Sequence, residues 1–124
     1  MAKTNFGGIE ANDATTGIGY GKGAGSTVTQ ITSRTTGVTI NSCSGAITLV
    51  SAAGSTTPAT FTVTNSAVAA TDTININQKS GTDLYLLFIT NVAAGSFKVT
   101  SYTTGGTTTE QPVFNFTVLK GSTT

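Results

Sequence analysis

The sequence contains no histidine and no tryptophan, and it has a single cysteine, Cys43. Without histidine, the commonest general base and metal ligand of proteins is missing, and Ser-His-Asp and Cys-His catalytic arrangements are excluded. A lone cysteine cannot form a disulfide within the chain, so the fold does not depend on an oxidising compartment. No cation lies beside Cys43 in the sequence to activate it, which favours an inert thiol over a nucleophile.

Charge is scarce as well. Only 9% of the residues are charged, against about 25% in ordinary soluble proteins, and the net charge is +1. The 6 cations are scattered, so they form no cluster of the kind that binds nucleic-acid phosphates or an anionic membrane surface. Of the 5 acids, Asp72 and Asp83 are the pair most able to meet, yet each is better explained by a turn or a strand start. The sequence therefore predicts no enzyme, no catalytic residue, no metal, no cofactor, and neither a nucleic-acid nor a membrane partner.

Long apolar runs are also missing. No stretch approaches the roughly 20 apolar residues that a membrane-spanning helix needs. The first residues lack the apolar segment of a secretory signal. We therefore expect the chain to be made in the cytoplasm, and to act outside a cell only after lysis or as part of a particle.

Threonine, serine, glycine, alanine and asparagine take the place of charge, and they alternate with apolar residues in short segments. Phe61 and Val63 share one face of such a segment, and Ile74 and Ile76 share another, which is the period of half-buried strands. Turn-forming residues separate the segments. This pattern predicts an all-β fold, a single antiparallel β-sandwich or jelly roll of about eight short strands. Strands are expected at residues 28–32, 38–41, 46–50, 60–64, 84–89 and 114–118, and around residues 74–76 and 97–99.

One expected strand, residues 84–89, is apolar on both faces. A strand of this kind is either central in its sheet or has an outer face that meets a neighbouring subunit. In the second case, Leu84, Leu86 and Phe88 would contribute to an interface.

Residues 1–16 are polar and show no period, with isolated apolar residues at Phe6 and Ile9. We interpret them as an N-terminal arm, separate from a β-sandwich domain of residues 17–124. Such a segment is either mobile alone and ordered on a partner, or a frayed terminus, and the sequence leaves both open.

Residues 17–25 place alternating glycines directly before a threonine-rich segment. Their letters match a dinucleotide-binding fingerprint, but that motif follows a strand and opens a helix, whereas here a polar arm precedes and a strand follows. Lys22 is not followed by serine or threonine, so the loop is not a P-loop either. We expect Gly19, Tyr20 and Gly21 to belong to a flexible or tightly bent connector that aims the arm.

Short motifs also form an ordered series from residue 17 to about residue 120: GIGYGKGAG at 17–25, TVTQ at 27–30, TGVTIN at 36–41, FTVTNS at 61–66 and VAATD at 68–72. The series resembles a family of small virion proteins encoded by tailed bacteriophages and prophages. Small non-enzymatic β-sandwich proteins of such phages are often head decoration, or cement, proteins. By this analogy the resemblance implies a protein on the outer surface of the head.

The resemblance implies the major capsid protein as partner, together with self-association, a homotrimer being favoured and a homodimer remaining open. The residues expected at these interfaces are Phe6, Ile9, Gly19, Tyr20, Gly21, Leu84, Leu86 and Phe88. The alternative function is a tail-fibre or other virion adhesin module that binds host surface glycan. That alternative is weakened because no tryptophan is available as a sugar platform.

Overall fold

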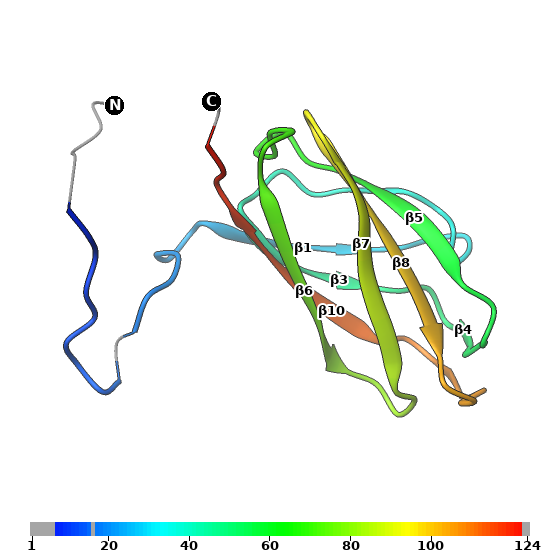
Figure 1. Cartoon of the computed structure of the whole chain (residues 1–124). Helices are drawn as coiled ribbons and strands as arrows, with labels where there is room; N and C mark the ends of the chain where they lie inside the picture. Colours follow the sequence, from blue (N-terminus) through cyan, green and yellow to red (C-terminus); the bar gives the residue numbers. More distant parts are fainter. Residues whose placement is uncertain (1–6, 16, 123–124) are drawn as a thin grey trace.

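The structure of the chain is a computed structural model that describes residues 7–15 and 17–122. Within these ranges it contains ten strands and no helix. Figure 1 shows the strands gathered into one body, with residues 7–15 lying to one side of it. Phe6, one of the residues expected at an interface, lies outside the described residues.

Eight strands form two four-stranded sheets. The first sheet has the order β1 (Gly25–Thr29), β3 (Ser44–Thr48), β10 (Val113–Leu119) and β6 (Thr73–Ser80). The second sheet has the order β2 (Val38–Thr39), β5 (Ala59–Thr64), β8 (Ser96–Thr103) and β7 (Tyr85–Ala93). A separate short pair joins β4 (Ala52–Ala53) and β9 (Thr109–Glu110).

The inner faces of the two sheets share one core. The ring of Phe97 in β8 lies 5.4 Å from that of Phe116 in β10, centroid to centroid. Tyr85 in β7 meets Phe114 in β10 edge-on at 5.6 Å. All four side chains are buried, and each contributes about 1.5–3 kcal/mol relative to an exposed position. Aromatic contacts between opposite sheets therefore hold the two layers together.

The predicted all-β sandwich is confirmed, and the eight expected segments correspond to β1–β3, β5–β8 and β10. The strands β4 and β9 are two residues each, too short for an alternating pattern to show. Not every pair is antiparallel, because β1 pairs with β3 and β2 pairs with β5 in the parallel sense. Alternation reports which residues share a face, but it carries no information on strand direction.

The apolar segment 84–89 lies at the edge of its sheet, since the strand order ends at β7. Its interpretation as a central strand is therefore wrong. Tyr85 points into the core, while Phe88 on the opposite face is exposed. The other interpretation, a strand whose outer face meets a neighbouring subunit, stays a prediction.

Candidate functional site

An apolar surface lies on the outer face of the second sheet, at its β7 edge. Phe88 is 47% exposed and Leu84, directly before β7, is 67% exposed. Leu86 lies between them in the sequence and is half-buried. The Phe88 ring stacks on Tyr102 of β8, with centroids 6.1 Å apart and planes inclined by 15°. We call Leu84, Leu86, Phe88 and Tyr102 the β7 patch.

The surroundings of the β7 patch are neutral and rich in hydroxyl groups. The Thr100 hydroxyl lies 2.7 Å from that of Thr60 in β5 and 3.1 Å from that of Thr90 in β7. Lys98 is the only charged residue in β5, β7 and β8. A surface with so few charges fits a protein partner better than a strongly charged one.

β7 is the edge strand of the second sheet, and β6 of the first sheet lies beside it. Natural proteins blunt exposed sheet edges with lysine, proline, bulges or a covering segment. β7 has nine residues without proline or charge, and its one irregularity is a shift of register between Ile89 and Asn91. The Gln78 side chain accepts a hydrogen bond from the Tyr85 N–H (3.0 Å), which pairs one backbone donor at the start of the strand. The register shift and the neighbouring β6 limit the free part of this edge, so the feature that marks β7 as a candidate docking surface is its exposed apolar face.

The glycine-rich loop leads into β1 from the opposite outer face. Within it, the Tyr20 hydroxyl donates a hydrogen bond to the backbone carbonyl of Val118 in β10. Partial burial of the hydroxyl, and then the nearby Cys43 thiol, raise the pKa of Tyr20 above its usual value. This single side chain therefore pins the loop to the end of the first sheet.

The tight bends of this loop occur at Gly17 (φ 63°) and Gly23 (φ 90°), where residues with a side chain are disfavoured. Gly19 and Gly21, which were expected in the connector, have no such torsion, and a methyl group at either position would meet no atom within 4 Å. Glycine at these two positions is not required by contacts within the described chain. Both leave free space on either side of Tyr20.

Beside Tyr20 lies a groove of about 460 Å³ on the outer face of the first sheet. Its apolar lining comes from Ile18, Tyr20, Val118 and Leu119, and its polar wall includes Asn75. Ile18 is 74% exposed and Leu119 63% exposed, so their apolar surface is not covered by the chain. We call this the loop groove.

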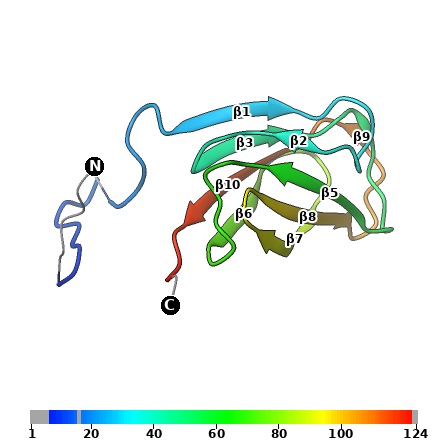
Figure 2. The same cartoon turned by 90° about the horizontal axis from the view of Figure 1, so that it is seen from above.

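The structure does not bring the expected interface residues into one site. The loop groove lies on the first sheet and the β7 patch on the outer face of the second, and Figure 2 shows β1 and β7 on opposite sides of the sandwich. The arm residue Ile9 is 73% exposed, and residues 7–15 are exposed throughout. The described residues therefore form two separate apolar surfaces, and residues 7–15 cover neither of them.

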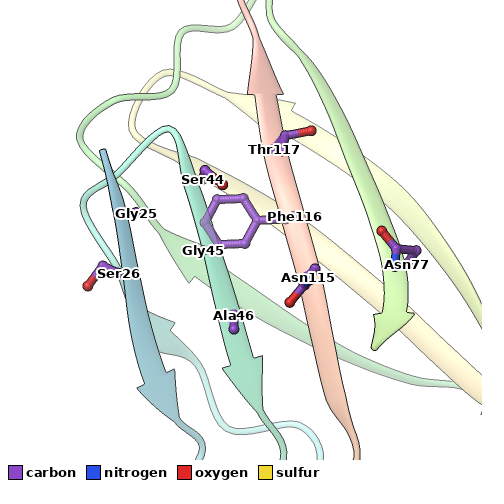
Figure 3. Close-up of a pocket in the computed structure, with 9 residues that line it drawn as sticks. All are labelled: Gly25, Ser26, Ser44, Gly45, Ala46, Asn77, Asn115, Phe116 and Thr117. Carbon is purple, nitrogen blue, oxygen red and sulfur yellow. The ribbon is translucent and has the colours of Figure 1, made fainter. Parts of the chain in front are cut away.

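A second hollow, of about 330 Å³, lies on the outer face of the first sheet (Figure 3). Its walls carry the amides of Asn77 and Asn115 and the hydroxyl of Thr117, and no charged residue lines it. Gly45 in its floor cannot carry a side chain freely, because a methyl group there would lie 2.7 Å from Ile40 Cδ1. The hollow is thus a neutral surface between strands, and its glycine is explained by packing.

The acids occupy structural positions. Asp72 and Asp83 lie at opposite ends of β6, so they do not form the carboxylate pair of a glycosidase. Asp83 Oδ2 accepts the Thr108 N–H (2.8 Å). Asp72 Oδ2 accepts the Ala69 N–H (2.8 Å) and pairs with Lys120 Nζ at 2.5 Å. Both carboxylates therefore stabilise the backbone near the two ends of β6, as their places in the sequence indicate.

Acid sensitivity should follow from Asp72. The Ala69 N–H bond, and then Lys120, hold the pKa of Asp72 below its usual value. Its stabilising contribution is therefore complete above the unfolded pKa of about 3.9, and is lost as the pH falls through the folded value. We expect Asp72→Asn to be less stable at neutral pH and to lose less stability between about pH 5 and pH 2. Denaturant unfolding at several pH values measures this, and Glu10→Gln in the exposed arm should keep the wild-type slope.

The sequence did not reveal the role of Arg34. Its guanidinium donates to the carbonyls of Val50 (3.0 Å) and Ala52 (2.7 Å). It also donates to the carbonyl of Glu110 (3.0 Å) and lies 5.7 Å from the centre of the Tyr85 ring. One loop cation thus ties β4, β9 and the start of β7 into one end of the sandwich, a role that only long-range contacts can show.

Glu110 completes that end of the sandwich. Its carboxylate accepts hydrogen bonds from the backbone N–H groups of Thr82 and Asp83. The Thr82 bond is the main reason why the pKa of Glu110 is lowered. The Glu110 carboxylate therefore holds the loop that leads into the β7 patch in place.

Within residues 7–15 and 17–122, no group of three or more histidine, cysteine, aspartate or glutamate side chains is placed to hold a metal ion. The same residues include no helix long and apolar enough to cross a membrane. Comparison of the chain with protein-family models, curated proteins and solved structures finds no match. The surfaces of the chain itself are therefore the basis for a proposal.

Proposed function

We propose that the chain is a decoration, or cement, protein that binds the outer surface of a tailed-phage head and stabilises contacts between major capsid subunits. The observation that carries this proposal is the β7 patch, an exposed apolar surface at the edge strand of the second sheet. The sequence resemblance to small phage virion proteins supports the same role.

The proposed mechanism is the bridging of capsid subunits by many copies. The β7 patch buries its apolar side chains on the major capsid protein, and contacts between copies join neighbouring sites. Because bound copies raise the effective concentration of one another, modest contacts add up to a large stabilisation of the shell. Binding to the assembled shell alone also stabilises it by mass action. A neutral, threonine-rich surface suits this dense packing, because neighbouring copies do not repel each other.

Binding to heads tests the proposal. Purified chain is mixed with phage heads that lack it, and the heads are recovered by sedimentation. We expect saturable binding at a fixed number of copies per head, and heads that resist heat better than undecorated heads. Recovery of bare heads at every protein concentration would remove the proposal.

A second candidate is a virion adhesin module that binds host glycan. The observation that favours it is the stacked Phe88–Tyr102 pair, a flat aromatic surface beside the paired hydroxyls of Thr60 and Thr100. Sugars bind to such combinations of an aromatic face with polar groups. Binding of the isolated chain to a glycan array, together with no binding to heads, would favour this candidate over decoration.

A further inference from the structure

The first sheet has an open edge at β1. This strand pairs with β3 on one side, and within the described residues no strand pairs with it on the other side. Figure 2 shows β1 as the outermost strand on its side of the sandwich. At the other edge of the same sheet, β6 lies beside β7. The described chain therefore leaves the outer side of β1 unpaired.

The unpaired backbone groups of this edge belong to Gly25, Thr27 and Thr29. The Gln30 N–H donates to the Thr48 carbonyl of β3 (2.8 Å), so Gln30 faces β3. Successive residues of a strand direct their backbone groups to opposite sides, so the alternate residues before Gln30 face away from β3. Their N–H and C=O groups form a row with which another strand can pair.

β1 lacks the features that protect natural edge strands. Its sequence, GSTVT, contains no charge and no proline, and its pairing with β3 runs without a bulge over all five residues. Four of these residues are exposed. By contrast, the edge strand β6 carries Lys79, and its pairing with β10 shifts register. A regular, neutral edge of ordinary strand length is a template for an added strand.

This edge is complementary to itself. In an antiparallel pair of two copies centred on Thr27, each Thr27 faces its counterpart and Gly25 faces Thr29, so every outward backbone group finds a partner. Symmetric pairing brings like residues together, and charged side chains at such positions repel each other. β1 has no charge, and a Thr–Thr pair is a favourable cross-strand contact. These features favour a second copy over a strand of another protein.

Gly25 also fits this arrangement. Glycine inside a strand weakens it, and it often marks the close approach of another backbone. Packing within the chain does not require glycine here, because a methyl group would lie at an ordinary 3.6 Å from the Ser44 carbonyl oxygen and the φ angle is not positive. In the antiparallel pair, the β-branched side chain of Thr29 lies opposite Gly25 and takes up the free space.

We infer that two copies of the chain associate through β1, antiparallel and with Thr27 on the two-fold axis, so that the two first sheets join into one. The contact is isologous, since both copies use the same strand. Because the axis is perpendicular to the joined sheet, the second sheets of both copies lie on the same side of it. The two β7 patches then face the same way. Under the proposed function, on which this last step alone rests, one dimer binds two sites on the head.

Disulfide trapping of the isolated full-length chain tests the pairing and its register. In a Cys43→Ala background, chains carrying Thr27→Cys should oxidise to a linked dimer, because residues paired across the axis lie within the Cα separation of a disulfide. Thr29→Cys is the matched control, since Thr29 is also exposed and faces the same edge but lies away from the axis. It should give about tenfold less linked dimer. Gly25→Cys and Thr29→Cys chains, when mixed, should link to each other.

A proline variant tests the edge without a cross-link. Thr27→Pro removes an outward N–H and no hydrogen bond to β3, so the chain should still fold. Sedimentation of the wild-type chain should show a dimer whose fraction grows with concentration. The Thr27→Pro chain should dimerise about tenfold more weakly or less, and denaturant unfolding checks that it is folded.

Pairing through β1 is overturned if Thr27→Cys gives no more linked dimer than Thr29→Cys, or if the wild-type chain sediments as a monomer at every concentration. A monomeric wild type whose Thr27→Pro variant no longer binds heads would assign this edge to a strand of the capsid instead. Linked Thr27→Cys dimers from a chain that does not bind heads would remove the proposed function and leave the dimer standing.

Discussion

Replacing Leu84 and Phe88 together by serine should weaken binding to phage heads about a hundredfold, which corresponds to about 2.7 kcal/mol. Exposed apolar and aromatic side chains at the centre of an interface supply most of its binding energy. Both side chains lie on the outer face of the second sheet and are 67% and 47% exposed in the free chain. The free energy of unfolding should therefore change by less than about 1 kcal/mol. Titration of labelled chain onto heads measures the binding, and denaturant unfolding measures the stability.

Ile31→Ser is the control for the double replacement, because Ile31 is 79% exposed and lies outside the β7 patch. It removes one exposed apolar side chain where the double variant removes two, and it should leave head binding within about twofold of the wild type, as expected of a residue outside the energetic centre. Wild-type affinity in the double variant would show that β7 does not face the head. Equal weakening by the control would show that binding depends on general hydrophobicity.

Arg34→Ala should lower the free energy of unfolding by about 3 kcal/mol, since it leaves three backbone carbonyls without their donor. Each lost partner costs a part of the desolvation penalty of its group, and neither β4 nor β9 carries a cation of its own. The midpoint of denaturant unfolding measures the loss.

Two milder variants separate the contributions of Arg34. Tyr85→Phe removes only the hydroxyl that lies 3.3 Å from the guanidinium and should cost no more than about 1 kcal/mol. Arg34→Lys keeps the charge but loses the planar fork, so its cost should lie between the two. An Arg34→Ala protein as stable as the wild type would mean that these carbonyls are satisfied by water.

The sequence predicted the sandwich because alternation is a local signal. Phe61, Val63, Phe97 and Val99 are all buried as their spacing indicates. Strand direction could not be predicted in the same way. β1 joins β3 in parallel across about 20 residues of chain, and β3 joins β10 in antiparallel pairing across about 70, so these choices depend on segments that are not neighbours in the sequence.

The β7 patch was also largely predictable. The sequence singled out Leu84, Leu86 and Phe88 because their segment is apolar on both faces. Apolar residues on the solvent-exposed face of a strand are not explained by packing within the chain. Tyr102 was missed, although its spacing from Phe97 and Val99 places it on the outer face of β8, where it stacks on Phe88. The loop groove could not be predicted, since it forms only where Ile18 and Tyr20 meet the far end of the chain at Leu119.

The position of the chain on the particle tests the proposed function most directly. Particles purified from lysed cells that encode the chain are labelled with gold-conjugated antibody and viewed by electron microscopy. Decoration predicts gold spread over the whole head surface and absent from the tail. Gold confined to the tail or its tip would contradict decoration and favour the glycan-binding adhesin, and particles without gold would contradict both.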